Sequence, residues 1–231
     1  MKNKKILLLT VTIVSTLCFN GFSQTRISSP YSRYGIGDLQ NNKYLQNISM
    51  GGMSYGFRSP LCVNYANPAS YTAFDTTSFV FETGVNSQVV ELSTKSLSQK
   101  SNYTSLGFLT FGFPVTKWWG ASIGLLPFSS VGYNVSYEET PVNIGRTKYT
   151  YEGTGGLSQF YLGNAFRLWK NFSAGFNASF LFGSHDKIAT VSFPDSSAYM
   201  YALRLKNSAF VNDFSFSYGL QYVKPLNNDI T

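Results

Sequence analysis

Apolar and polar residues alternate along three stretches of this chain, with the period of two that is typical of a β-strand. Between Phe172 and Gly183, Phe and Ala occupy one face and Ser, Gly and Asn most of the other, and Phe210 to Tyr222 repeats the scheme. A weaker version begins at Phe79. An apolar face opposite a small or polar face is expected when one side of a strand meets lipid and the other a lumen. A soluble β-sandwich also alternates, but its buried face favours branched aliphatic residues, so the Phe and Ala favour a barrel.

This pattern predicts an all-β fold, an antiparallel transmembrane β-barrel. Six strands are expected, over residues 78–91, 103–114, 119–137, 156–168, 172–183 and 209–223. A seventh is expected to begin at Ile230, and residues 187–205 are expected to add a small extracellular hairpin. The short links 114–119, 169–171 and 224–229 alternate with the long polar links 93–102, 138–155 and 184–207. Periplasmic turns and extracellular loops alternate in this way. Since the smallest such barrels have about eight strands, we expect the N-terminal part of a longer protein.

The stretch from Met50 to Tyr71 departs from this alternation. It is too rich in Gly and Pro for a helix, yet it carries many side chains that are usually buried. We therefore expect a compact, irregular plug, or hatch, enclosed by the barrel wall. The predicted organisation is a signal peptide over 1–23, a periplasmic lead-in and hatch over 24–76, and an incomplete barrel over 77–231. The lead-in, residues 24–47, is polar and turn-rich, and we expect no regular secondary structure in it.

Composition agrees with an outer-membrane barrel. Aromatic residues make up 17% of the 231 residues and charged residues 13%, against about 25% charged residues in a typical soluble domain. The mean hydropathy of -0.07 suits strands that place only alternate residues in lipid. Basic clusters with interleaved aromatics, the pattern of nucleic-acid binding, are absent from the sequence, and no nucleic-acid partner is expected.

Residues 1–23 are typical of a secretory signal peptide. Three lysines precede an apolar run over 6–19, and small residues at 21 and 23 precede a predicted cleavage before Gln24. A lipoprotein signal around Cys18 is disfavoured because Leu17 stands where a small residue is needed. An uncleaved anchor is disfavoured because the run is shorter than the ~20 residues that span a membrane. Cleavage would remove three lysines, lower the net charge from +7 to +4, and leave Cys62 as the one cysteine. The predicted location is the bacterial outer membrane.

Pro127 lies inside the third predicted strand. Proline cannot donate to a ladder, so within a sheet it requires a bulge, a kink or a gap. Gly124 and neighbouring glycines make bending easier. An ordinary bulge is one interpretation. The other is a break in strand pairing that opens the wall sideways toward lipid.

Several sequence features together resemble the FadL-type family of outer-membrane long-chain fatty-acid transporters. They are a signal peptide, a Met-Gly-Gly sequence, an Asn-x-x-Asn-Pro-Ala sequence and a barrel with a kinked third strand. The residues that match are Gly51, Gly52, Asn64, Asn67, Pro68 and Ala69. The runs at 124–134 and 152–166 are also similar to a branch of exported barrels in that family.

The resemblance implies a fourteen-stranded barrel of which this chain supplies about six or seven strands. Asn67, Pro68 and Ala69 would form the hatch motif, and Gly124 with Pro127 the kink that gives a lateral exit. The expected function is passive uptake of hydrophobic small molecules such as long-chain fatty acids. The expected partners are the outer-membrane lipid bilayer and the hydrophobic ligand, and no cofactor is expected. The alternative is a structural or accessory barrel for protein secretion or surface attachment, with a secretion apparatus as its partner.

An enzyme is not expected. His185 is the single histidine, and it lies in a Gly-Ser-His-Asp-Lys sequence that we interpret as a solvated loop tip. Ser184 is its neighbour in sequence, and adjacent residues rarely meet as nucleophile and base. One His and one mature Cys provide no cluster of metal ligands.

Overall fold

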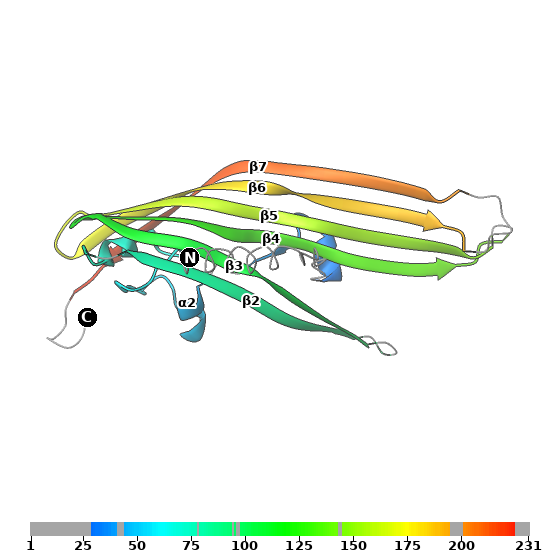
Figure 1. Ribbon diagram of the computed structural model, residues 1–231, viewed down its shortest axis with the longest axis horizontal. Helices are drawn as coiled ribbons and strands as arrows, with labels where there is room; N and C mark the ends of the chain where they lie inside the picture. Colours follow the sequence, from blue (N-terminus) through cyan, green and yellow to red (C-terminus); the bar gives the residue numbers. More distant parts are fainter. Residues whose placement is uncertain are drawn as a thin grey trace, which may run out of the picture.

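The computed structural model describes residues 29–40, 44–77, 79–93, 95, 98–142, 145–194 and 201–224. Its core is one antiparallel seven-stranded sheet, which confirms the all-β prediction. Six strands follow one another in chain order (Figure 1): β2 (Val80–Ser93), β3 (Ser98–Thr116), β4 (Trp119–Glu139), β5 (Thr147–Arg167), β6 (Phe172–Ser192) and β7 (Leu203–Tyr222). The short β1 (Asp38–Leu39) pairs with β4. Within the described residues the sheet is open, with β2 and β7 at its two edges.

The strands run further than their apolar alternation indicates. The β4–β5 ladder continues to the pair Glu139 and Thr147, and the β6–β7 ladder to the pair Val191 and Leu203. The predicted long links 138–155 and 184–207 are therefore wrong, because most of those residues extend the main ladders. These residues include many Thr, Tyr, Val and Ile, which favour β-strands even where both faces of the strand are exposed to water. The two arms of the hairpin predicted at 187–205 pair with one another, but as the far end of the β6–β7 ladder and not as a separate element. Ile230 lies outside the described residues.

The short links at 114–119 and 169–171 form turns, as predicted. At ~3.3 Å per residue, the 21 residues of β4 extend about 70 Å, well beyond a hydrocarbon layer of about 30 Å. Each long strand is therefore longer than a membrane crossing requires, and its end away from the short turns extends beyond the stretch in which apolar and polar residues alternate. In the part of the chain that the structure describes, no helix is long and apolar enough to cross a membrane.

The two faces of the sheet reverse the usual distribution of polarity. The face that carries residues 44–77, called here the inner face, buries polar side chains, among them Thr110, Ser122, Gln159, Asn177 and Ser179. The opposite, outer face exposes large apolar side chains, among them Phe111, Phe160, Leu162, Phe182 and Phe214. A soluble domain buries its apolar residues first. The outer face thus has the apolar composition that the predicted lipid-facing side requires.

The lead-in contains regular structure, contrary to the prediction. A 3₁₀ helix, η2 (Pro30–Arg33), begins after Ser29, whose hydroxyl accepts a hydrogen bond from the Tyr31 amide, and β1 follows. The turn-forming residues of this stretch thus act as caps. Helix α2 (Leu45–Ser49) and the 3₁₀ helix η3 (Pro68–Ala73) come next. Residues 29–40 are called the arm below, and residues 44–77 the inner segment.

The inner segment packs on the inner face. Its buried apolar side chains meet those of the sheet in one cluster: Tyr44, Val63, Tyr71 and Phe74 from the segment, and Val80, Phe108, Leu126, Tyr161 and Ala165 from the strands. In Figure 1 the segment lies along one side of the curved sheet. This is the position that an enclosed plug requires, while enclosure itself stays a prediction.

Candidate functional site

The Asn-Pro-Ala sequence begins η3 and fixes it to the sheet. The Asn67 side-chain oxygen accepts a hydrogen bond from the Ala69 amide at 3.2 Å, which caps the helix. Pro68 occupies the first helical turn, where its missing N–H costs nothing. The Asn67 side-chain nitrogen donates to the carbonyl oxygens of Tyr55 at 2.6 Å and of Leu220, on β7, at 3.3 Å. One side chain therefore joins a helix start, a loop and a strand.

The other predicted hatch residues shape the rest of the inner segment. The Asn64 side chain donates to the carbonyl oxygens of Ser54 at 2.6 Å and Phe57 at 3.1 Å, and it accepts from the Asn47 side chain at 3.2 Å. Gly51 and Gly52 have φ values of +69° and +85° and end α2, where left-handed glycines are common. All six predicted residues thus lie in one packed segment.

A row of small residues on the inner face lets η3 approach the sheet. Gly120, Ala165, Gly175 and Gly219 are register partners across β4, β5, β6 and β7. A Cβ atom on any of the three glycines would lie closer than 3.0 Å to η3 or its cap. For Gly175 the nearest atoms are backbone atoms of Pro68 and Ala69. Sequence reasoning counted Gly175 and Gly219 among small lumen residues and missed the row. The row depends on the register of four strands, which no single stretch of the sequence shows.

Buried polar contacts continue beneath η3. The Tyr71 hydroxyl donates to the Asn177 side-chain oxygen at 3.0 Å, and the Asn177 side-chain nitrogen donates to the Tyr65 carbonyl at 3.1 Å. Tyr71 has no exposed surface, and burial raises the pKa of its hydroxyl well above its usual range. The side chains of Tyr71 and Asn177 therefore both find partners within the protein.

Two arginines hold the other side of η3. The Arg58 guanidinium donates to the Thr72 hydroxyl at 3.0 Å and to the Gln221 side chain at 3.0 Å, and Arg167 donates to the Thr72 carbonyl at 2.7 Å. Burial, and then the nearby charge of Arg167, lower the pKa of Arg58. The inner segment is thus bound to β5 and β7 by charge-assisted hydrogen bonds, which are stronger than neutral ones.

Pro127 marks the place where β3 and β4 part. The β3–β4 ladder ends at the pair Leu109 and Leu125, whereas β4 keeps its pairing with β5 through one bulge between Pro127 and Ser129. Beyond that point β3 pairs with β2 alone, and Figure 1 shows β2 and β3 diverging from β4. Gly124 lies just before the parting, paired with Thr110. The gap between residues 98–108 of β3 and residues 126–139 of β4 is called the seam below. A lateral exit for ligand through it stays a prediction.

A hydroxyl cluster that sequence reasoning missed stands at the root of the seam. The Tyr161 hydroxyl, on β5, contacts the hydroxyls of Thr110 on β3, Ser122 on β4 and Tyr44 of the inner segment, the last two at 2.8 Å and 3.2 Å. The Tyr44 ring stacks on Phe108 with 4.1 Å between ring centroids. Tyr161 shares its strand face with Gln159, Gly163 and Ala165, and the large aromatic ring among these smaller neighbours was the available signal.

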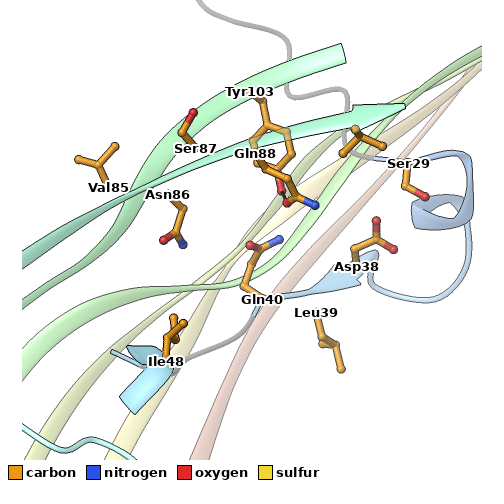
Figure 2. A pocket seen from close by; sticks show the side chains of 11 residues that line it. Ser29, Asp38, Leu39, Gln40, Ile48, Val85, Asn86, Ser87, Gln88 and Tyr103 are labelled. Carbon is orange, nitrogen blue, oxygen red and sulfur yellow. Dashed lines mark hydrogen bonds between the residues drawn. The ribbon is translucent and has the colours of Figure 1, made fainter. Parts of the chain in front are cut away.

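A cavity of about 630 Å³ opens along the seam between the arm and the β2–β3 pair (Figure 2). Its lining residues include Asp38, Leu39 and Gln40 of the arm and Asn86, Gln88 and Tyr103 of β2 and β3. Figure 2 shows the side chain of Gln40 directed toward that of Gln88. The lining is mainly neutral and polar, with Asp38 as its one charged side chain.

His185 is not at a loop tip. It lies within β6, paired with Gly155 and Ala209, and its side chain is buried. The loop-tip interpretation failed because β6 continues through a polar sequence. Ser184 and His185, as successive residues of a strand, point to opposite faces. Among the described residues, no three His, Cys, Asp or Glu side chains are grouped closely enough to hold a metal ion.

A model of the BamG family matches residues 3–231. The chain belongs to the BamG family. No curated protein and no solved structure matches the chain. BamG membership and the all-β sheet together fit a bacterial outer-membrane-associated β-protein. BamG is a different family from the FadL type, and the resemblance to FadL-type transporters stays a prediction.

Proposed function

We propose that this chain forms part of an accessory outer-membrane β-barrel that supports the assembly of other β-barrel proteins. The BamG family is related to barrel assembly, which favours the accessory role over uptake. The structural observation that carries the proposal is the packing of the inner segment. Its helix η3 lies on the glycine row and is held by Asn67, Arg58 and Arg167.

The inner face suits a scaffold better than a passage for lipids. Sites for hydrophobic ligands are lined mainly by apolar and aromatic side chains. The described inner face is instead lined by buried polar groups such as Ser122, Gln159 and Asn177, which already have partners in the protein. A fatty acid on this route would have to displace those hydrogen bonds without replacing them.

The outer face supports membrane insertion. Its exposed Phe, Leu and Tyr side chains would face lipid, and Trp118 and Trp169 stand beside the two short turns, where an aromatic girdle is expected. In this proposal further strands close the sheet into a barrel around the inner segment. The short turns lie on the periplasmic side.

Depletion of the full-length protein from its own cells tests the accessory role. Quantitative mass spectrometry of outer membranes should show reduced amounts of several unrelated β-barrel proteins, while outer-membrane lipoproteins serve as the unaffected control. A tagged copy should co-purify with barrel-assembly components. Unchanged barrel proteins after depletion, together with no co-purification, would refute the proposal.

Passive uptake of hydrophobic molecules is the second candidate, and the seam beside Pro127 is the observation that favours it. Full-length protein carrying Pro127→Ala and Gly124→Val should lose fatty-acid uptake if the seam is the exit. Uptake at the wild-type rate would exclude a lateral exit. Mass spectrometry of lipid retained by the purified protein would identify a ligand directly.

A further inference from the structure

We propose that the edge of β4 at the seam is a docking site for an extended polypeptide segment, which pairs with β4 in place of the arm. The inference rests on the proposed accessory function and names its class of partner. The partner is a segment with alternating apolar and polar residues, the pattern of an outer-membrane strand.

β3 leaves this edge, and the arm covers part of it. From Leu126 to Glu139, β4 pairs with β5 on one side and, within the described residues, with the two residues of β1 on the other. Across the seam, β3 from Ser98 to Phe108 pairs only with β2. Unpaired backbone N–H and C=O groups along a sheet edge form a template for another strand. Addition of a strand to such an edge is a common mode of peptide recognition.

The arm shows that the edge accepts an antiparallel chain. Asp38 pairs with Ser130 and Leu39 with Ser129, and the Gln40 amide donates to the Phe128 carbonyl at 2.9 Å. The pairing is short, and the Leu39 side chain remains 68% exposed. The Ser29 amide also donates to the Gly132 carbonyl, and the Gly132 amide to the Ser32 hydroxyl, each at 3.1 Å. The arm therefore covers the edge from Phe128 to Gly132, and beyond Gly132 the edge has no strand partner on this side among the described residues. A longer segment could form more backbone hydrogen bonds and more apolar contact.

The seam has room for such a segment. The cavity of about 630 Å³ lies between the arm and β2. A second cavity of about 200 Å³ lies between Tyr133 and Asn134 of β4 and Gln99 and Ser101 of β3. The amide and hydroxyl groups in both linings can bond the backbone or the polar side chains of a guest, and Val85 and Val90 offer apolar contact. The predominantly neutral lining favours an uncharged segment over an acidic or basic one.

Two glycines of the arm provide a matched pair of variants. Gly37 has a φ of +94°, and a Cβ atom there would lie closer than 3.0 Å to the Ser130 carbonyl oxygen and the Val131 side chain. Gly35 has a φ of +57°, and a Cβ atom there would meet nothing within 4 Å. Both alanine variants strain a left-handed backbone. Only Gly37→Ala should also lift the arm from β4.

A reversible lock can hold the arm in place. Leu39 and Ser129 stand opposite one another in the ladder. Directly opposed residues of an antiparallel pair have Cα atoms about 4.5–5.5 Å apart, which is within the range of a disulfide. Leu39→Cys with Ser129→Cys, in a Cys62→Ser background, therefore pins the arm when oxidised and frees it when reduced. The same protein serves as its own control for folding.

The test is photo-crosslinking to purified full-length protein in detergent. The probe is a synthetic peptide copying residues 210–222, with an N-terminal benzophenone and a fluorophore, and a scrambled peptide without alternation is the control. Gly37→Ala should raise the yield of crosslinks to residues 128–134 several-fold over wild type and over Gly35→Ala. Oxidation of the lock should abolish these crosslinks, and reduction should restore them.

Equal yields from the oxidised and reduced lock, or equal yields from the two peptides, would overturn the proposal. This result is separable from that of the depletion experiment. Crosslinking without any effect of depletion on barrel proteins leaves the docking edge intact and removes the accessory function. An effect of depletion without crosslinking removes the docking edge alone.

Discussion

Substitution of Gly175 by alanine should loosen the inner segment from the sheet. The added methyl group would lie closer than 3.0 Å to the backbone of Pro68 and Ala69, which cannot move without shifting η3. Extra methyl groups in a packed interior cost about 1–3 kcal/mol. β6 is a strand in both the docked and the undocked state. The lower backbone freedom of alanine therefore affects the two states equally, and the whole steric cost lowers the stability of the docked state. The undocked population should rise about five- to 150-fold.

The thiol of Cys62 reports this change. Cys62 is 4% exposed, and burial raises the pKa of its thiol, so alkylation requires the segment to leave the sheet. Mass spectrometry of full-length protein treated with N-ethylmaleimide would give the rate at Cys62. When opening is fast relative to labelling, the rate follows the undocked population, and Gly175→Ala should raise it by the same factor.

Gly107→Ala is the matched control. It also adds a methyl group to a strand glycine, but the nearest atoms belong to the flexible side chain of Asn86, which borders the seam cavity and can move. Its labelling rate at Cys62 should equal that of wild type. If Gly175→Ala labels no faster than Gly107→Ala, the glycine row does not hold η3 and the reasoning fails.

Substitutions on three further elements, β5, η3 and β7, have defined outcomes. Tyr161→Phe leaves the Tyr44 hydroxyl without its Tyr161 partner and should lower the free energy of unfolding by about 1–3 kcal/mol, measured by urea denaturation. Asn67→Ala should cost about 1–2 kcal/mol by the same assay, and Asn67→Asp should cost at least as much, because it keeps the capping oxygen but turns a second oxygen toward the Tyr55 and Leu220 carbonyls. Phe214→Arg on the outer face should destabilise the protein in lipid bilayers by about 2–4 kcal/mol, and Leu205→Arg, on the opposite face of β7 and near its far end, by less. Equal effects at positions 214 and 205 would argue against a lipid belt on the outer face.

The sequence predicted those elements whose structure is determined by residues close together in the chain. The alternation at 172–183 predicted both the strand and its faces, because an apolar belt opposite small residues is visible without knowledge of neighbours. Pro127 predicted a strand defect because a missing N–H has few structural solutions, and the bulge lies there. Asn67 and Pro68 predicted a fixed, irregular segment for similar reasons.

Features that depend on the register between strands could not be predicted from the sequence. The glycine row exists because Gly120, Gly175 and Gly219 meet at one height across three strands, and no single stretch shows that height. The strand ends near Glu139 and Ser192 were missed because polar ladders carry no alternating apolar signal. The pairing of the arm with β4 joins residues about ninety positions apart, so local patterns could not indicate it.

The most direct test of the accessory role is the folding rate of a newly synthesised outer-membrane barrel protein, followed by pulse-chase in cells depleted of this protein. The rate should fall on depletion and recover with the wild-type gene. The oxidised Leu39→Cys, Ser129→Cys lock should give a lower rate than the same variant under reduction. A folding rate unchanged by depletion, accompanied by a loss of fatty-acid uptake, would contradict the accessory role and favour a transporter.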